Sequence, residues 1–172
     1  MSLYDHSVPT YKQILGGMKG VLDKAIAHYS EKKLEQVSLM HDRLYPDMFT
    51  FARQVQSLCD HAAGSSLRLA GKEVNLPARD ETTLEQLRER VVKSLAMVES
   101  VSKADVDAHA NKPITFPMGP RQVTMNGTEY MMHFAFPNFY FHATTAYNIL
   151  RHRGIIIGKR DFLGVVPGMP AA

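Results

Sequence analysis

Apolar residues recur at helical spacing in four long segments, and this periodicity limits the fold more than any other feature of the sequence. From Val8 to Tyr29 they recur at steps of three and four, which places them along one face of a helix of about six turns. The other stripes lie within residues 51–69, 84–98 and 126–152. We therefore predict an all-α protein in which four long helices pack their apolar faces together as a bundle.

Local signals mark the expected ends of the middle helices. Pro46 suits the first position of a helix because its missing amide donor would be unsatisfied there anyway. The second helix is therefore predicted to start near Pro46 and to end at Gly71, since glycine readily takes the left-handed conformation that terminates helices. Thr82 and Glu85 match a capping box, which predicts a third helix over about residues 83–100.

Long connections separate these helices. Residues 72–81 have no helical period, and in an extended form they would reach about 33 Å, so this segment could cross the whole bundle. Before the last helix, residues 114–116 and 122–124 flank a turn-rich stretch, which predicts a small β-hairpin. The last helix is predicted over residues 126–152, with a kink or local break at Pro137.

Length and composition exclude several classes of protein. A chain of 172 residues is typical of one folding unit, so residues 1–172 are predicted to form a single domain. Apolar residues at 45% and charged residues at 22% are close to globular averages, which argues against a disordered chain. The net charge of +3 is small, and the lysines and arginines are spread along the sequence. We therefore expect no nucleic-acid partner.

The sequence also limits the expected location of the protein. Its apolar stretches fall short of the roughly 18 residues that a membrane-spanning helix needs, and the first residues do not resemble a secretory signal. Cys59 is the only cysteine, so the chain can form neither an internal disulfide nor a cysteine-based zinc site. We expect a cytoplasmic protein with no membrane partner, and we interpret Cys59 as a small buried core residue.

Two of the eight histidines are predicted to point into the bundle. At about 100° per residue, His142 shares a face with Ala135, Asn138 and Ala146, and His61 lies at the polar flank of the second apolar stripe. Two helices could therefore bring these imidazoles together. Neutral imidazole is a good ligand for zinc, nickel, copper or iron, and bundles often hold metals between facing helices. Inward histidines are also commonly hydrogen-bonded core residues, so spacing alone leaves both interpretations open.

Other polar residues give weaker signals. His133 falls nearly opposite His142 on an ideal helix, and we interpret it as a hydrogen-bonded structural histidine. Arg53 and Arg68 could bind an anion or a carboxylate, although charged residues commonly flank amphipathic helices. The sequence contains neither a glycine-rich phosphate loop nor a nucleophile elbow.

Two stretches resemble a known family. They are LYPDMFTFARQVQSLCDH, which ends at His61, and FPNFYFH, which ends at His142 and runs on to Gly154 and to GKRDFLG at residues 158–164. Both are similar to an uncharacterised domain-of-unknown-function family of the DinB/YfiT-like superfamily, and the likeness extends over residues 3–164. The resemblance implies a DinB-like four-helix bundle and frequent homodimers. Many superfamily members bind a divalent metal through three histidines, and some are thiol-dependent transferases.

The resemblance also implies a set of site residues. His61 matches the metal ligand on the second helix, and His142 matches the second histidine on the fourth helix. Asn138 stands where the other histidine of that helix should be. An amide oxygen is a weaker ligand than imidazole for a borderline-soft metal, so the usual site is incomplete. These residues could hold one divalent metal, zinc or nickel, together with waters, or they could form a buried hydrogen-bond cluster with Asn138 donating to one ring.

Two hypotheses about function follow. In the first, His61, Asn138 and His142 polarise a small-molecule substrate, and a metal takes part in the reaction. In the second, the protein is a non-catalytic homodimer that serves as a binding or structural module without metal, and the three side chains only fill the core.

Overall fold

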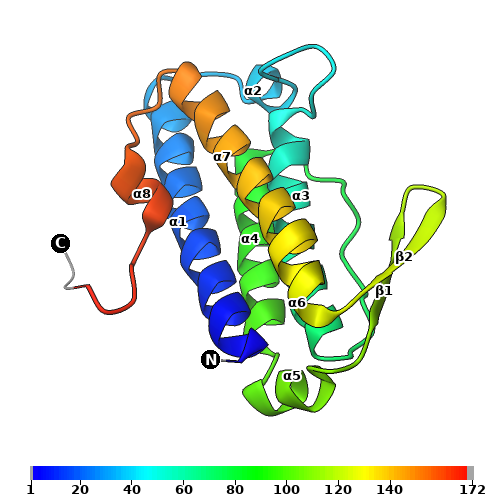
Figure 1. The fold of residues 1–172 in the computed structure, drawn as a ribbon. Helices are drawn as coiled ribbons and strands as arrows, with labels where there is room; N and C mark the ends of the chain where they lie inside the picture. Colours follow the sequence, from blue (N-terminus) through cyan, green and yellow to red (C-terminus); the bar gives the residue numbers. More distant parts are fainter. Residues whose placement is uncertain (1, 170–172) are drawn as a thin grey trace.

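The computed structural model describes residues 2–169 and shows a mostly helical fold with one small hairpin (Figure 1). Its four long helices are α1 (Leu3–Glu31), α3 (Phe51–Leu69), α4 (Leu84–Glu99) and α7 (Phe136–His152), and they pack side by side. The shorter elements are α2 (Val37–Met40), α5 (Lys103–His109), β1 (Ile114–Met118), β2 (Arg121–Met125), α6 (Gly127–Glu129), the π-helix η1 (Tyr130–Ala135) and α8 (Lys159–Leu163). No helix among the described residues is long and apolar enough to cross a membrane.

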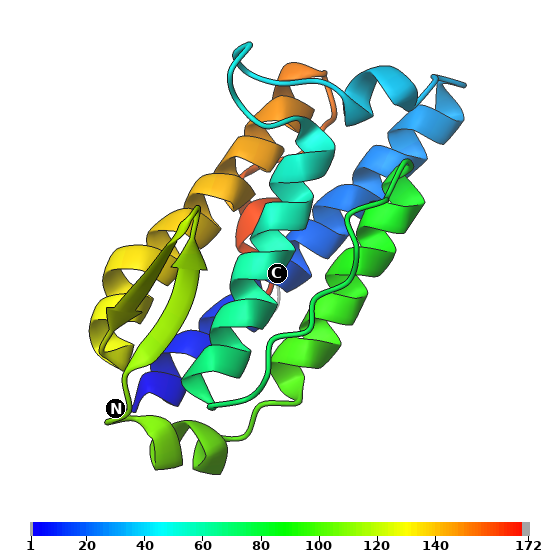
Figure 2. The same cartoon turned by 90° about the vertical axis from the view of Figure 1, so that its right-hand side faces the viewer.

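A long extended segment makes α3 and α4 run in the same direction. After α3 ends, residues 72–83 return along the length of the helices before α4 begins (Figure 2). The length of residues 72–81 had predicted that this segment could cross the whole bundle. As a result, α3 packs against both α4 and α7, while α1 packs against α4.

The start of α3 differs from the sequence-based expectation. The helix begins at Phe51 rather than near Pro46, and Thr50 is its N-cap, with a side-chain oxygen that accepts from the Arg53 amide. A Thr in this position satisfies one of the free amides of the first turn, and this local signal prevails over the proline. The capping box of α4 is likewise shifted by one position, to Thr83 and Gln86.

The last long helix changes its hydrogen-bond pattern instead of breaking. The π-helix η1 precedes α7, so that Pro137 falls in the first turn of α7, where its missing amide donor costs little. The expected local break at Pro137 therefore takes the form of a π-helical segment. Such segments are rare, and they shift the helical register of the side chains that follow them.

The expected hairpin is present and is tighter than the sequence suggested. Its two strands pair antiparallel from Ile114 opposite Met125 to Met118 opposite Arg121. Pro117 and Met118, which we placed in the turn, belong to β1, and the turn is left to Gly119, with a φ of 59°, and Pro120.

The C-terminal segment lies against α1. A Cβ built on Gly17 would lie 2.3 Å from the carbonyl oxygen of Phe162, so only glycine fits at this contact. Gln13 adds a hydrogen bond from its Nε2 to the carbonyl oxygen of Leu163, at 3.0 Å. The segment that carries α8 thus contacts the middle of α1, from Gln13 to Lys24.

Candidate functional site

The packing of α3 against α7 brings His61 and His142 together. Their ring centroids are 5.5 Å apart and their planes are inclined by 18°. His142 is buried on the inward face of α7, as its spacing predicted, and His61 is half-buried on α3. We call these two side chains the histidine pair.

The tautomer of His142 is set by a chain of hydrogen bonds. The Gln54 side chain donates from Nε2 to the Phe49 carbonyl oxygen at 3.3 Å, which turns its Oε1 toward His142. Because that oxygen can only accept, Nδ1 of His142 must carry the proton that it donates, at 2.7 Å. Nε2 then holds a lone pair, and no described residue makes a hydrogen bond to it. Gln54 therefore prepares His142 as an acceptor or a metal ligand.

Aromatic rings enclose the histidine pair. Phe49 lies parallel to His142 at 6.0 Å between centroids, and Phe141 meets the same ring edge-on at 5.4 Å. Phe134 contacts His61 in the same edge-on way at 5.9 Å. Phe49 and Phe141 keep 47% and 54% of their surface exposed, so both rings are available to a bound molecule.

Both histidines are neutral at physiological pH. Burial lowers the pKa of His61 to about 4, and the neighbouring His142 lowers it further. Burial also lowers the pKa of His142 to about 4, with additional repulsion from Arg53 and Arg79. A ring that stays unprotonated can donate a nitrogen lone pair to a metal or to a polar group of a ligand.

The side-chain amide of Asn138 bonds the backbone of its own helical segment. Its Nδ2 donates to the Phe134 carbonyl oxygen at 2.7 Å and not to an imidazole, which differs from the hydrogen-bond cluster that was one of the two alternatives for this residue. This hydrogen bond secures the junction between η1 and α7. It also leaves Oδ1 of Asn138 as the free atom of the amide, one helical turn before His142.

The donor set at the pair is small. Within residues 2–169 there is no group of three His, Cys, Asp or Glu side chains that could hold a metal. The donors that the structure brings together are the nitrogens of His61 and His142, and Asn138 lies one helical turn before His142 on α7. His133, interpreted above as a hydrogen-bonded structural residue, is instead exposed to solvent.

A buried charge cluster lies beside the histidine pair, and sequence analysis did not identify it. Arg90 of α4 is only 2% exposed, and its guanidinium bonds Asp60 at 2.6 Å and Glu81 at 2.7 Å. It also donates to the carbonyl oxygens of Ala78 and Pro77, at 2.7 and 3.3 Å. Arg90 thus joins α3, α4 and the crossing segment. Its partner on α3, Asp60, is next in sequence to His61. The place of Arg90 within the apolar stripe of α4 was a signal of this role.

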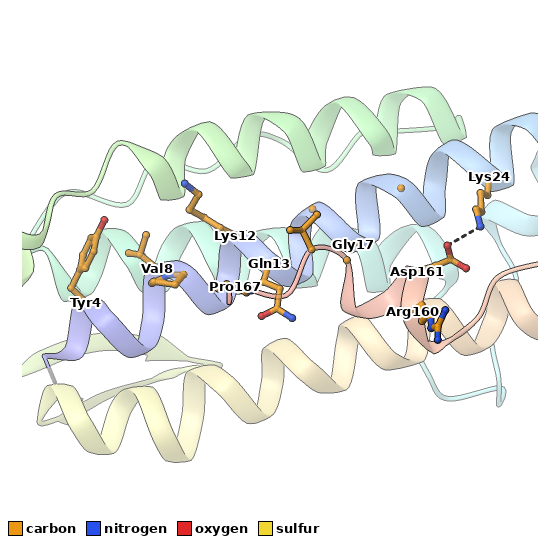
Figure 3. Close-up of a pocket in the computed structure, with 14 residues that line it drawn as sticks. Tyr4, Val8, Lys12, Gln13, Gly17, Lys24, Arg160, Asp161 and Pro167 are labelled. Carbon is orange, nitrogen blue, oxygen red and sulfur yellow. Dashed lines mark hydrogen bonds and ion pairs between the residues drawn. The ribbon is translucent and has the colours of Figure 1, made fainter. Parts of the chain in front are cut away.

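A cavity lies away from the histidine pair, between α1 and the C-terminal segment (Figure 3). Its volume is about 650 Å³, and its lining includes Lys12, Gly17, Lys24 and Asp161. Lys24 is paired with Asp161 at 2.7 Å, as Figure 3 shows, and Lys12 is paired with Glu99 at 2.9 Å. We call this cavity the α1 groove.

Comparison with known proteins gives the family. A family model described as a domain of unknown function, DUF1993, matches residues 3–163. The chain belongs to the DUF1993 family. A crystal structure described as a DinB family member protein from Shewanella denitrificans is similar to it, with 38% sequence identity and a TM-score of 0.87. The match covers 98% of this chain and 96% of that one.

These comparisons place the DUF1993 chain in the DinB-like superfamily, as the two sequence stretches indicated. No curated protein matches the sequence. The comparisons therefore supply the family and the fold of a relative, while the chemistry has to be argued from the site itself.

Proposed function

We propose that this DUF1993 protein binds a small molecule at the histidine pair, with a divalent metal, zinc or nickel, held by His61, His142 and Asn138. The observation that supports the proposal is the bond from His142 to Gln54, which leaves Nε2 of His142 unprotonated and without a partner in the described chain. Metal-bound histidines usually donate their other ring nitrogen to such an acceptor, because this fixes both the tautomer and the orientation of the ring.

The donors fit a borderline-soft cation. Two neutral imidazoles and one amide oxygen suit zinc or nickel better than calcium or magnesium, which prefer oxygen ligands. A metal held by only three protein atoms keeps positions open for a substrate, and when bound it would act as a Lewis acid on that substrate. The protein itself supplies the neutral nitrogens, the fixed tautomer and the aromatic surroundings that limit water.

Zinc titration of the purified, chelator-treated protein tests this proposal. We expect about one zinc per chain, measured by calorimetry and by elemental analysis, and a rise in melting temperature with added zinc chloride. His142→Ala should abolish the binding. Gln54→Leu should weaken it by about 10- to 100-fold because the second nitrogen of His142 loses its acceptor.

His133→Ala is the matched control, since His133 belongs to the same helical segment but is exposed. It should bind zinc as the unmodified protein does. If the unmodified protein binds no zinc, or if His142→Ala and His133→Ala bind equally well, the metal-dependent function is wrong.

A function without metal is the second candidate, and the absence of a third His, Cys, Asp or Glu donor in residues 2–169 favours it. In that case the neutral rings accept hydrogen bonds directly from a ligand, or the cluster belongs to a non-catalytic binding or structural module. If it is only structural, His61→Phe and His142→Phe should leave the melting temperature nearly unchanged and remove no ligand-dependent shift.

We also propose that the four long helices form the four-helix bundle of the DinB-like superfamily and that the protein is a homodimer of single-domain chains. Exposed apolar side chains support self-association: Met132 on η1 and Tyr140 on α7 are 49% and 40% exposed. Multi-angle light scattering tests this, and a monomer at micromolar concentration would contradict the dimer without affecting the site.

A further inference from the structure

The charges near the histidine pair do not balance. Four arginines, Arg53, Arg68, Arg79 and Arg90, lie there with two carboxylates, Asp60 and Glu81. Arg90 bonds both carboxylates, and Arg79 donates to Asp60 from Nε at 2.6 Å. Glu81 also accepts from Nε2 of Gln56 at 2.9 Å. Every oxygen of both acids therefore already accepts a bond, and two arginines, Arg53 and Arg68, are left without an acidic partner among the described residues.

Arg68 reaches the Tyr130 hydroxyl at 3.5 Å, whereas the Arg53 guanidinium makes no hydrogen bond to another described residue. Among residues 2–169 no carboxylate lies within ion-pair distance of this guanidinium, which packs over the Phe49 ring at 5.3 Å from the centroid. Partial burial lowers the pKa of Arg53, and repulsion from Arg79 lowers it further. A half-buried cation that is repelled by its neighbours favours binding of an anion.

The position of Arg53 connects this cation to the histidine pair. Phe49, over which the guanidinium packs, lies parallel to His142. Arg53 also lines a cavity of about 490 Å³ next to the pair, together with Gln56, Arg79 and Glu81, although neither histidine lines it. This volume is sufficient for a small organic molecule.

We propose that Arg53 binds the carboxylate of the small molecule that the protein takes at the histidine pair. The guanidinium presents a planar fork of donors that matches a carboxylate, while the exposed faces of Phe49 and Phe141 contact the apolar body of the ligand. The ligand class is thus a small apolar carboxylic acid. This inference rests on the proposed function for the location of the site, and the metal is not required for it.

Benzoate is the probe, because it combines a carboxylate with a flat apolar body. The full chain, both chelator-treated and zinc-loaded, is titrated with sodium benzoate at constant ionic strength, and the melting temperature and the dissociation constant are measured. Benzamide, which has the same shape and no charge, is titrated in parallel, as is inorganic phosphate. We expect benzoate to raise the melting temperature and the other two compounds to have little effect.

Variants identify the residue responsible. Arg53→Met should weaken benzoate binding by about 10- to 100-fold, as the loss of one charge-assisted contact predicts, and should leave zinc binding unchanged. Arg160→Met removes an exposed arginine of the α1 groove and should bind benzoate normally. Arg53→Lys, which keeps the charge but lacks the fork, should give an intermediate affinity.

Nuclear magnetic resonance gives the location. Benzoate should shift the ring-proton signals of His142 and leave those of the exposed His133 in place. The proposal is overturned if Arg53→Met binds benzoate as tightly as the unmodified protein, if benzamide or phosphate binds as tightly as benzoate, or if the His142 signals do not move. A protein that binds no zinc but binds benzoate through Arg53 would retain this inference and lose only the metal.

Discussion

The histidine pair and the α1 groove differ in how their polar groups are satisfied. The groove is the larger space, at about 650 Å³ against about 490 Å³ beside Arg53. Its lysines, however, are already paired with Asp161 and Glu99. At the histidine pair, Nε2 of His142 has no hydrogen-bond partner and Arg53 has no carboxylate partner within the described residues. Unsatisfied donors and acceptors therefore locate the candidate site better than volume does.

The two regions also differ in where their ion pairs lie. The Arg90 cluster beside the histidine pair is almost completely buried, with side-chain exposures of 1% for Arg90, 10% for Asp60 and 11% for Glu81. In the α1 groove, Lys24 is 52% exposed. Water can replace a lost partner in the groove but not in the buried cluster, so the same kind of substitution should have unequal effects.

The largest expected effect comes from Arg90→Met. Removing this guanidinium leaves Glu81 buried without a cation and Asp60 with Arg79 alone, which should lower the free energy of unfolding by about 3–5 kcal/mol. Lys24→Met in the α1 groove is the matched control and should cost at most about 1 kcal/mol. Urea unfolding followed by circular dichroism measures both values. Equal losses would remove the contrast between the two regions.

Gly17→Ala tests the close backbone contact in the α1 groove. The added Cβ would meet the Phe162 carbonyl oxygen, so the C-terminal segment must move, at a cost of about 1–3 kcal/mol. Gly16→Ala places the same methyl group on the adjacent residue, where nothing lies within 4 Å. It should stabilise the helix by up to about 1 kcal/mol. Thermal unfolding of the two variants should give shifts of opposite sign, and shifts of the same sign would contradict the contact.

The pH dependence of stability sharpens the description of the histidine pair. Unfolded histidine binds a proton near pH 6.5, whereas His61 and His142 in the folded chain bind one only near pH 4. As the pH falls below 6.5 the unfolded state takes up more protons, so the free energy of unfolding decreases. Between pH 6.5 and 5.5 each ring should contribute a loss of up to about 1 kcal/mol.

Urea unfolding at several pH values measures this loss. His142→Gln retains a polar group next to Gln54, and both this variant and His61→Gln should reduce the pH dependence. If both variants keep the full pH dependence, the pair is not the source of it.

Sequence patterns predicted the parts of the structure that depend on a single element. The four long helices and the inward position of His142 followed from periodicity, because burial of an apolar face imposes one spacing along a helix. His61 was placed at the polar flank of its stripe for the same reason. The predicted start of α3 near Pro46 was wrong. The helix begins at Phe51 because Thr50 caps it, and the proline alone did not indicate this.

Features that join several elements could not be predicted in this way. The partners of Arg90 lie on α3 and on the crossing segment, which has no period from which its position could be read. The bond from Gln54 to His142 joins two helices far apart in the sequence, so neither residue alone indicates it. For Asn138 the sequence left a metal ligand and a donor to an imidazole as alternatives, and the π-helix before α7 offers its amide group a backbone carbonyl instead.

The contact between Gly17 and the Phe162 carbonyl has a consequence for biosynthesis. On the ribosome α1 is synthesised well before residues 158–164, which cover its glycine face. That face must therefore stay solvated or be held by a chaperone until translation has passed residue 164. Nascent chains stalled before this point should be cleaved by protease within α1 more readily than released chains.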